Sequence, residues 1–305
     1  MPILSVVIPL FNEAGLVEEI IERVKNNLEI ITEDYEILIV DDGSTDSTWE
    51  NILNYTLDKR IRGIKFSRNF GQHYAITAGL HKSVGEWVVV MDGDLQDRPE
   101  VIPELYRKAM TGFDIVFVSR QNRPEKMYYL ITQKLFYVIL KTLSGIDFDS
   151  RQANFSIISR KVVEEFKNFS ENSRFYGSTI KWLGFKRSEI MADHGQRHSG
   201  IPSYTLKSRL KLATEVILSF SNRPLRFATA LGLLLSISSI IIAIYLLVGT
   251  ILWGYSVTGW ASLIIALFFL SGIILSILGI LGIYIGKIFD QTKDRPLYII
   301  SESTN

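Results

Sequence analysis

The first 120 residues alternate short apolar runs with segments of helical periodicity. The apolar runs are predicted strands, and they lie at Leu4–Pro9, Tyr35–Val40, Ile61–Ser67, Trp87–Met91 and Asp114–Ser119. The segments between them are predicted helices, at Ala14–Leu28, Thr45–Leu57, Gly71–Ser83 and Pro99–Met110. Strands that are apolar throughout and separated by helices indicate a parallel sheet covered on both faces. We therefore expect an α/β domain with a mostly parallel sheet over residues 1–225.

Two long apolar runs follow this domain. Phe227–Trp253 and Trp260–Gly286 contain no charged side chain, and each exceeds the roughly 20 residues that a membrane-spanning helix needs. Basic residues flank only their outer ends, namely Arg223, Arg226, Lys287, Lys293 and Arg295. By the positive-inside rule, these flanks predict a two-helix transmembrane domain at 226–290 in the cell (inner) membrane. The N-terminal domain, both termini and a tail at 291–305 would then be cytoplasmic.

Two further segments are too polar to span a bilayer. Residues 127–144 include Lys134 and Lys141, and residues 205–220 carry their lysines and arginine near the start. Taken alone, each segment suits a core helix of a larger α/β domain as well as a helix at the membrane surface. Their nearness to a membrane anchor favours interfacial helices, whose lysines would reach anionic headgroups.

Composition excludes several other classes of protein. The formal net charge is +1, from 33 basic and 32 acidic residues, so we expect no nucleic-acid binding. The absence of cysteine excludes disulfides and thiol chemistry, in agreement with a cytoplasmic domain. No basic region followed by an apolar run and a small-residue cleavage site opens the chain, so we expect no secretory signal.

Polar clusters follow the first four predicted strands. They are Phe11-Asn12-Glu13, Asp41-Asp42-Gly43-Ser44, Arg68-Asn69-Phe70-Gly71 and Asp92-Gly93-Asp94. Ligands of parallel sheets bind beyond the carboxyl ends of the strands, so these clusters should form one site. Asp92, Asp94 and Gln96 place oxygen-bearing side chains at alternate positions, which can converge on one hard divalent cation. Alone, such a cluster is more often an acidic turn, and the other three clusters favour a site.

These motifs resemble those of the family 2 glycosyltransferases of GT-A fold, which is Rossmann-like. The similar stretches are Val7–Glu13, Val40–Asp46, Ser67–Gly71 and Met91–Gln96. The most similar subgroup is the polyisoprenyl-phosphate glycosyltransferases, which include dolichol-phosphate mannose synthases and bactoprenol glucosyltransferases. The resemblance covers the whole chain and includes the two C-terminal apolar runs.

The resemblance implies roles for individual residues. The nucleotide of a nucleotide-sugar donor would contact Pro9, Phe11, Glu13, Val40, Asp42, Asn69, Gly71, Asp92 and Gly93. Asp92, Asp94 and Gln96 would hold Mg²⁺ or Mn²⁺ against the two phosphates, where the metal neutralises charge on the leaving group. The implied catalytic residues are Asp94, Asn154, Arg120 and Arg197. The acceptor phosphate would contact Arg120, Arg123, Lys134, Arg197 and Ser203, since arginine suits phosphate through bidentate hydrogen bonds.

Two positions depart from the pattern of this subgroup. Asn154 stands where relatives carry an acid proposed as base or sugar anchor, and Ser203 stands where some carry lysine. Asparagine cannot take a proton, but a phosphate monoester with a second pKa of about 6 is already mostly a dianion near pH 7. We therefore expect Asn154 to orient sugar or acceptor phosphate without a protein base, with Asp147 and Asp149 as alternatives. Sugar choice would depend on contacts around Asn154, Arg160 and the loop near Tyr176.

The expected function is inverting, metal-dependent transfer of a sugar, with a UDP-sugar favoured over a GDP-sugar as donor. The acceptor would be polyprenyl (undecaprenyl or dolichyl) phosphate at the cytoplasmic face of the lipid bilayer. A processive polysaccharide synthase would need a Gln-x-x-Arg-Trp motif and more spans. A catalytically inactive membrane platform or sensor with the same fold is the alternative. Small residues in the second apolar run permit a homo-oligomer, at Gly272, Ser276, Gly279, Gly282 and Gly286.

Overall fold

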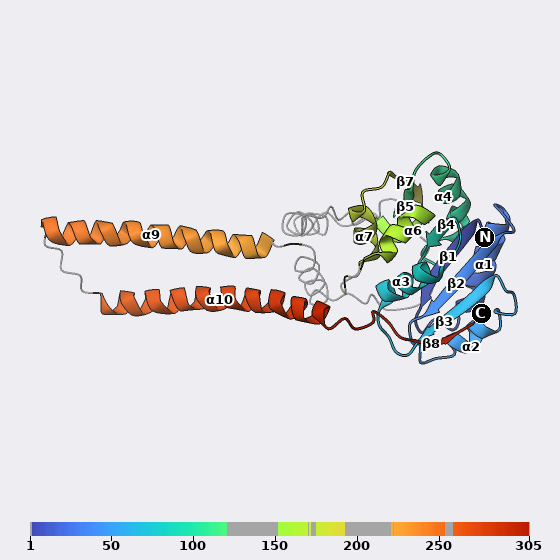
Figure 1. The fold of residues 1–305 in the computed structure, drawn as a ribbon, viewed down its shortest axis with the longest axis horizontal. Helices are drawn as coiled ribbons and strands as arrows, with labels where there is room; N and C mark the ends of the chain where they lie inside the picture. The colour runs from blue at the N-terminus through green and yellow to red at the C-terminus, as the bar shows by residue number, and fades with distance from the viewer. Residues whose placement is uncertain are drawn as a thin grey trace, which may run out of the picture. The chain divides into compact units, whose positions relative to one another are not determined.

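The computed structural model describes residues 2–120, 152–169, 171, 175–192, 221, 223–253 and 259–304. These residues belong to two compact units (Figure 1). The first, here the sheet unit, falls within Met1–Met127, Phe148–Ser203 and Arg295–Asn305, and the second, here the helix unit, within Tyr128–Asp147 and Tyr204–Asp294. The interfacial helices predicted at 127–144 and 205–220 lie outside the described residues.

The sheet unit is an α/β structure. Its strands are β1 (Leu4–Leu10), β2 (Tyr35–Asp41), β3 (Ile61–Phe66), β4 (Trp87–Val90), β5 (Ile115–Arg120), β6 (Gln152–Ser159), β7 (Arg187–Ala192) and β8 (Ile300–Ser303). Its helices are α1 (Val17–Glu29), α2 (Thr48–Leu53), α3 (Gln72–Lys82), the 3₁₀ turn η1 (Pro99–Val101), α4 (Ile102–Ala109), α6 (Arg160–Lys167) and α7 (Tyr176–Trp182). The described strands form one sheet in the order β7-β5-β6-β4-β1-β2-β3-β8. All five predicted strands and all four predicted helices are present.

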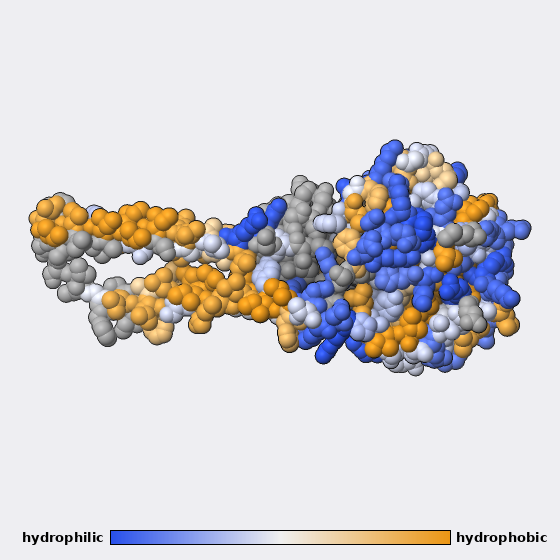
Figure 2. All heavy atoms as spheres, in the orientation of Figure 1, coloured by the Kyte–Doolittle hydropathy of each residue, from blue (hydrophilic) through white to orange (hydrophobic). Residues whose placement is uncertain are grey.

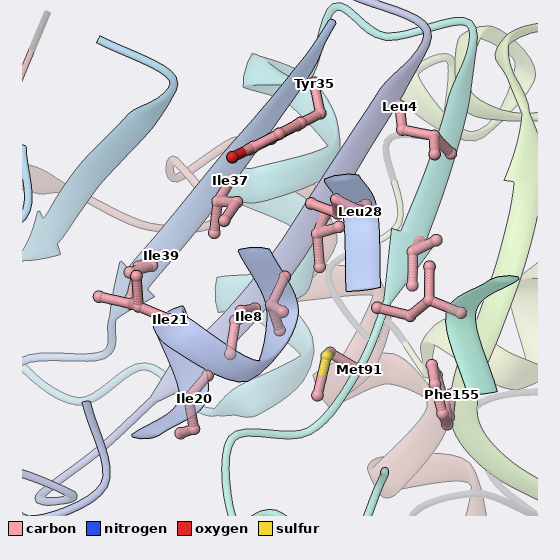
Figure 3. Packing of buried hydrophobic residues seen from close by; sticks show 14 of the residues in the cluster. Leu4, Ile8, Ile20, Ile21, Leu28, Tyr35, Ile37, Ile39, Met91 and Phe155 are labelled. Atoms are coloured by element: carbon pink, nitrogen blue, oxygen red, sulfur yellow. The ribbon is translucent and has the colours of Figure 1, made fainter. Parts of the chain in front are cut away.

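Helices cover both faces of this sheet, which is why β1 and β2 are buried at every position. On one face, Ile20, Ile21 and Leu28 of α1 pack toward the strands (Figure 3). On the other face, α3 packs with α6 and α7 against alternate residues of the same strands. The pairs β1–β2, β2–β3, β1–β4 and β5–β7 are parallel. The mostly parallel sheet predicted from the apolar runs is therefore confirmed.

Two strands that were not predicted, β6 and β8, run antiparallel to their neighbours. β6 runs antiparallel between β4 and β5, so β5 does not neighbour β4. β8 pairs antiparallel with β3, and Gly63 and Thr304 exchange hydrogen bonds of 2.8 and 3.0 Å. Within the predicted tail, residues 300–303 therefore complete the sheet at the edge of β3. β8 has only four residues, which is too short for its periodicity to be recognised in the sequence. Pairing with β8 protects the edge of β3, which would otherwise be open to pairing with another chain.

The helix unit contains α9 (Arg223–Trp253) and α10 (Trp260–Thr292). Both helices are long and apolar enough to cross a membrane by length and composition. Apolar side chains cover both along their length (Figure 2), and hardly any residue of the two candidate spans is buried. A core helix of a soluble protein would bury such residues against its neighbours.

Candidate active site

The loops after β1 and β2 are joined by side-chain hydrogen bonds. The Thr45 N–H donates to Asn12 Oδ1 at 2.8 Å, and the Asn12 N–H donates to Ser44 Oγ at 2.9 Å. The Glu13 N–H donates to Thr48 Oγ1 at 3.0 Å, at the start of α2. The first two predicted clusters therefore lie side by side at the carboxyl edge of the sheet.

Three residues predicted to contact a nucleotide lie at this edge. Pro9 and Val40 are register partners near the ends of β1 and β2. Phe11 follows β1 and is 42% exposed, so it is available to a ligand. An exposed aromatic ring at the end of a parallel strand offers a flat surface for a base or a sugar.

Asp42, in the loop after β2, holds the loop after β3 in place. Its buried carboxylate accepts hydrogen bonds from the Phe70 and Gly71 N–H groups, at 2.8 and 2.9 Å. Burial raises the pKa of the Asp42 carboxyl, and these two hydrogen bonds oppose that shift. Gly43 has a φ of +72°, and a Cβ added to it would lie 2.3 Å from the carbonyl carbon of Arg68. The loops after β2 and β3 therefore touch through backbone, which only glycine permits here.

Asp92 is held from three directions at the end of β4. Its Oδ1 accepts hydrogen bonds from Gln72 Nε2 at 2.6 Å and from Asn154 Nδ2 at 3.4 Å. Its backbone N–H donates to the buried carboxylate of Asp97 at 2.9 Å. Asp94 Oδ1 accepts the Gln96 N–H at 3.0 Å, which shapes the turn that carries both residues.

The donor chemistry of this turn fits a divalent metal. Asp92, Asp94 and Gln96 are each partly exposed and offer carboxylate and amide oxygens, which suit Mg²⁺ and Mn²⁺. Within the described part of the chain, no three acidic or histidine side chains form a ready metal cluster. A cation held by these side chains could complete its shell with phosphate oxygens of a bound molecule, which are its usual partners.

A series of hydrogen bonds links Asn154 to uncharged polar groups from β6, α7 and α3. Ser156 Oγ donates to the Asn154 carbonyl oxygen at 2.8 Å and lies 2.8 Å from the Tyr176 hydroxyl. The Tyr176 N–H donates to His73 Nδ1 at 3.4 Å. Burial lowers the pKa of His73 to about 4 and raises the pKa of Tyr176 above its ordinary value. These groups connect β6 and α7 to the start of α3 without a buried charge.

The structure brings most, but not all, of the predicted site residues together. Asn69 is exposed in the loop after β3, and Gly71, with a φ of +112°, precedes α3. Arg120 ends β5, whose backbone runs toward the same edge as β4. The predicted residues Arg123, Lys134, Arg197 and Ser203, and the alternatives Asp147 and Asp149, lie outside the described residues.

Arg160 is a correction to the sequence analysis. Its Nε donates to the Gly85 carbonyl oxygen at 2.8 Å and its Nη1 to the Ser83 carbonyl oxygen at 3.0 Å. These acceptors precede β4, so Arg160 lies at the amino edge of the sheet, away from Asp92. The reason is that β6 runs antiparallel to β4, which places Asn154 and Arg160 at opposite edges.

Gln72, His73 and Asp97 were not among the residues predicted for the site. Asp97 follows Gln96 directly, and the run of acids after β4 is a signal that could have identified it. Gln72 and His73 reach the site only because α3 begins at the carboxyl edge beside β4. No local pattern in the sequence carries that information.

Comparisons with known proteins identify the family of this chain. The profile of Glycosyl transferase family 2 matches residues 5–167. YkcC, an uncharacterized glycosyltransferase of Bacillus subtilis (strain 168), is 38% identical over 301 residues, which cover 98% of this chain and 93% of the relative. The SfII prophage-derived bactoprenol glucosyl transferase of Shigella flexneri is 34% identical over 303 residues, 98% of each chain.

A solved structure shares the fold of much of this chain. Glucosyl-3-phosphoglycerate synthase from Mycobacterium tuberculosis, in complex with Mn²⁺, UDP-glucose and phosphoglyceric acid, matches with a TM-score of 0.51 at 18% identity. The match covers 72% of this chain and 78% of that one, and it shows the GT-A fold. With the family profile and the full-length relatives, it follows that this chain is a member of glycosyltransferase family 2.

Proposed function

We propose that this protein transfers a sugar from a UDP-sugar to polyprenyl phosphate at the cytoplasmic face of a membrane. The observation that carries the proposal is the position of Asp92, which two amides hold beside Asp94 and Gln96 at the carboxyl edge. The full-length similarity to bactoprenol glucosyl transferases supports a lipid-borne acceptor. The two exposed apolar helices support attachment to the bilayer that would hold such a lipid.

The donor would lie across the ends of β1, β2 and β4. Phe11 and the backbone near Val40 would contact its base and ribose, while Asp42 would keep the Asn69–Gly71 loop in place. Asp92, Asp94 and Gln96 would hold Mg²⁺ or Mn²⁺. When bound, that cation would neutralise charge that develops on the leaving diphosphate.

The reaction would be a single displacement with inversion. An oxygen of the lipid phosphate attacks the anomeric carbon, and the bond from that carbon to the nucleoside diphosphate breaks. Because the lipid phosphate is mostly a dianion near pH 7, with a second pKa of about 6, no side chain needs to remove a proton. Asn154 would orient the sugar or the phosphate through its amide, and Arg120 would contact the acceptor phosphate.

The orientation follows from charge. Arg223 and Arg226 are at the start of α9, and Lys287 and Lys293 are at the end of α10. No basic residue lies in the short connection between the helices, so both outer ends would face the cytoplasm. The nucleotide sugar and the lipid phosphate would then meet on the same side of the membrane.

Transfer from a panel of radiolabelled nucleotide sugars into extracted membrane lipid, with Mg²⁺ or Mn²⁺, tests the proposal. The full-length protein should label a lipid that mild acid cleaves, and the Asp94→Ala variant should not. The panel would identify the sugar and the nucleotide in the same experiment. If the folded protein transfers no sugar to undecaprenyl phosphate from any donor, the proposal fails and a membrane platform of the same fold replaces it.

A further inference from the structure

The last residues of the chain contact the loop that follows β3. The Tyr298 ring stacks on the Phe66 ring, with centroids 5.0 Å apart and planes inclined by 13°. The Tyr298 hydroxyl lies 3.2 Å from His81 Nδ1 on α3. The Ser67 N–H donates to the Ile299 carbonyl oxygen at 3.0 Å, which extends the β3–β8 pairing to the first residue of the loop.

From Phe66 the contacts continue to Asp42. The Phe66 ring meets the Phe70 ring edge-on at 5.6 Å, and the Arg68 guanidinium lies 4.0 Å from the centroid of the Phe70 ring. The Phe70 N–H then donates to Asp42 Oδ1 at 2.8 Å. Tyr298 therefore supports, through Phe66, the loop whose other side Asp42 holds.

This support acts on a loop with few contacts of its own. Ser67, Arg68 and Asn69 are exposed, so burial does not fix their conformation. Their backbone is held by Ile299 at one end, by Gly43 in the middle and by Asp42 at the other end. The stack of Tyr298 on Phe66 adds a further support next to the start of the loop. Its loss leaves the loop more conformations, which a ligand must then restrict at a cost in affinity.

We propose that Tyr298 is a positioning residue, which holds the Ser67–Gly71 loop in the conformation that binds the nucleotide of the donor. The inference rests on the proposed function, since it concerns the same donor site. An aromatic pair of this geometry is worth about a 2- to 12-fold change in an equilibrium constant. Removal of the ring should therefore weaken donor binding and leave the bond-forming step nearly unchanged.

Four variants of the full-length protein in lipid nanodiscs separate positioning from plain packing. Tyr298→Ala and Tyr298→Leu both remove the ring, and leucine retains apolar bulk in case the alanine variant fails to fold. Tyr298→Phe keeps the stack and loses only the hydroxyl. Phe113→Ala is the matched control, because Phe113 is also a partly buried aromatic ring but contacts Lys108 and Lys186 near the start of β5.

The measurements are UDP affinity with Mn²⁺ by calorimetry, and KM and kcat for the nucleotide sugar. Tyr298→Leu should raise the dissociation constant and KM by about 3- to 10-fold, while kcat changes less than about twofold. Tyr298→Phe and Phe113→Ala should bind UDP as the wild type does, although Phe113→Ala lowers the melting temperature. If every ring-removing variant that folds binds UDP with wild-type affinity, the role of Tyr298 is refuted. The same holds if Phe113→Ala loses as much UDP affinity as Tyr298→Leu. Neither outcome affects the proposed function. A wild-type protein that binds neither UDP nor GDP overturns the proposed function as well.

Discussion

Gly93→Ala is the sharpest test of the geometry at the end of β4. Gly93 separates Asp92 from Asp94, and its φ is not in the left-handed region, so the backbone conformation would accept alanine. The space around Gly93, however, is too small for a Cβ atom. An added Cβ would lie 2.2 Å from Leu10 Cδ2 and 2.8 Å from the Pro9 carbonyl oxygen.

The size of the effect follows from these two distances. The Leu10 methyl group can rotate away, but the Pro9 carbonyl belongs to β1. Ordinary contact begins at 3.4 Å, so the turn must retreat from β1 by about 3.4 − 2.8 = 0.6 Å. Overpacking of this kind costs about 1–3 kcal/mol of stability. A misplacement of about 1 Å at a reacting centre can cost about 100-fold in rate, so we expect kcat/KM to fall by about 10- to 100-fold.

Two assays test this prediction, with one control variant. Transfer of labelled sugar gives kcat/KM, and titration with Mn²⁺ in the presence of UDP, followed by electron paramagnetic resonance, gives metal affinity. Both should fall in Gly93→Ala. Gly177→Ala is the matched control, because the residue is in α7 and, apart from its chain neighbours and the adjacent helix backbone, no atom lies within 4 Å of the added Cβ. It should retain activity and gain up to about 1 kcal/mol of helix stability.

A Gly93→Ala variant with wild-type kcat/KM and wild-type Mn²⁺ affinity would contradict this prediction. In that case the acidic turn would not need its close approach to β1. A variant that only melts earlier, by about 2–4 °C per kcal/mol for a domain of this size, would show that the contact matters for packing alone.

Three further predictions follow from contacts around Asp92 and α3. Gln72→Ala removes the 2.6 Å hydrogen bond to Asp92 and should weaken Mn²⁺ binding by about 3- to 10-fold; unchanged affinity contradicts a positioning role for this amide. Asn154→Asp replaces an amide donor with a second carboxylate, so the metal-free protein should melt at a lower temperature and Mn²⁺ should restore more stability than in the wild type. Burial lowers the pKa of His73 to about 4, so the unfolded chain takes up this proton near pH 6.5 while the folded protein does not. The free energy of unfolding should therefore fall as the pH drops from about 6.5 to 4, by up to about 3 kcal/mol, and the slope should flatten in His73→Gln.

The parts of the fold that could be predicted are those with a strong local signal. Apolar runs identified the strands from β1 to β5, and two long charge-free runs identified α9 and α10. The positions of β6 and β8 in the sheet could not be predicted, because the strands they pair with are distant in sequence. The direction of pairing also has no signature in a short stretch of sequence. The antiparallel direction of β6, which takes Arg160 to the amino edge, is the reason that the position of Arg160 was wrong.

Some residues of the candidate site could be predicted from the sequence and others could not. Residues directly after strands, such as Asp42 and Asp92, could be predicted because every parallel strand ends at the same edge. Gln72 could not, because it enters the site from the first turn of a helix. The 2.6 Å contact with Asp92 depends on how α3 packs across the sheet, and no spacing in the sequence encodes that distance.

The pairing of β3 with β8 has a consequence for biosynthesis. A ribosome makes β3 early and β8 only after both apolar helices. Until then the nascent domain carries an open row of N–H and C=O groups along β3, which is a template for pairing with another chain. A shortened chain that stops before α9 keeps that edge open permanently and would be prone to self-association. The maturation of this sheet therefore finishes only after translation of the apolar helices has been completed.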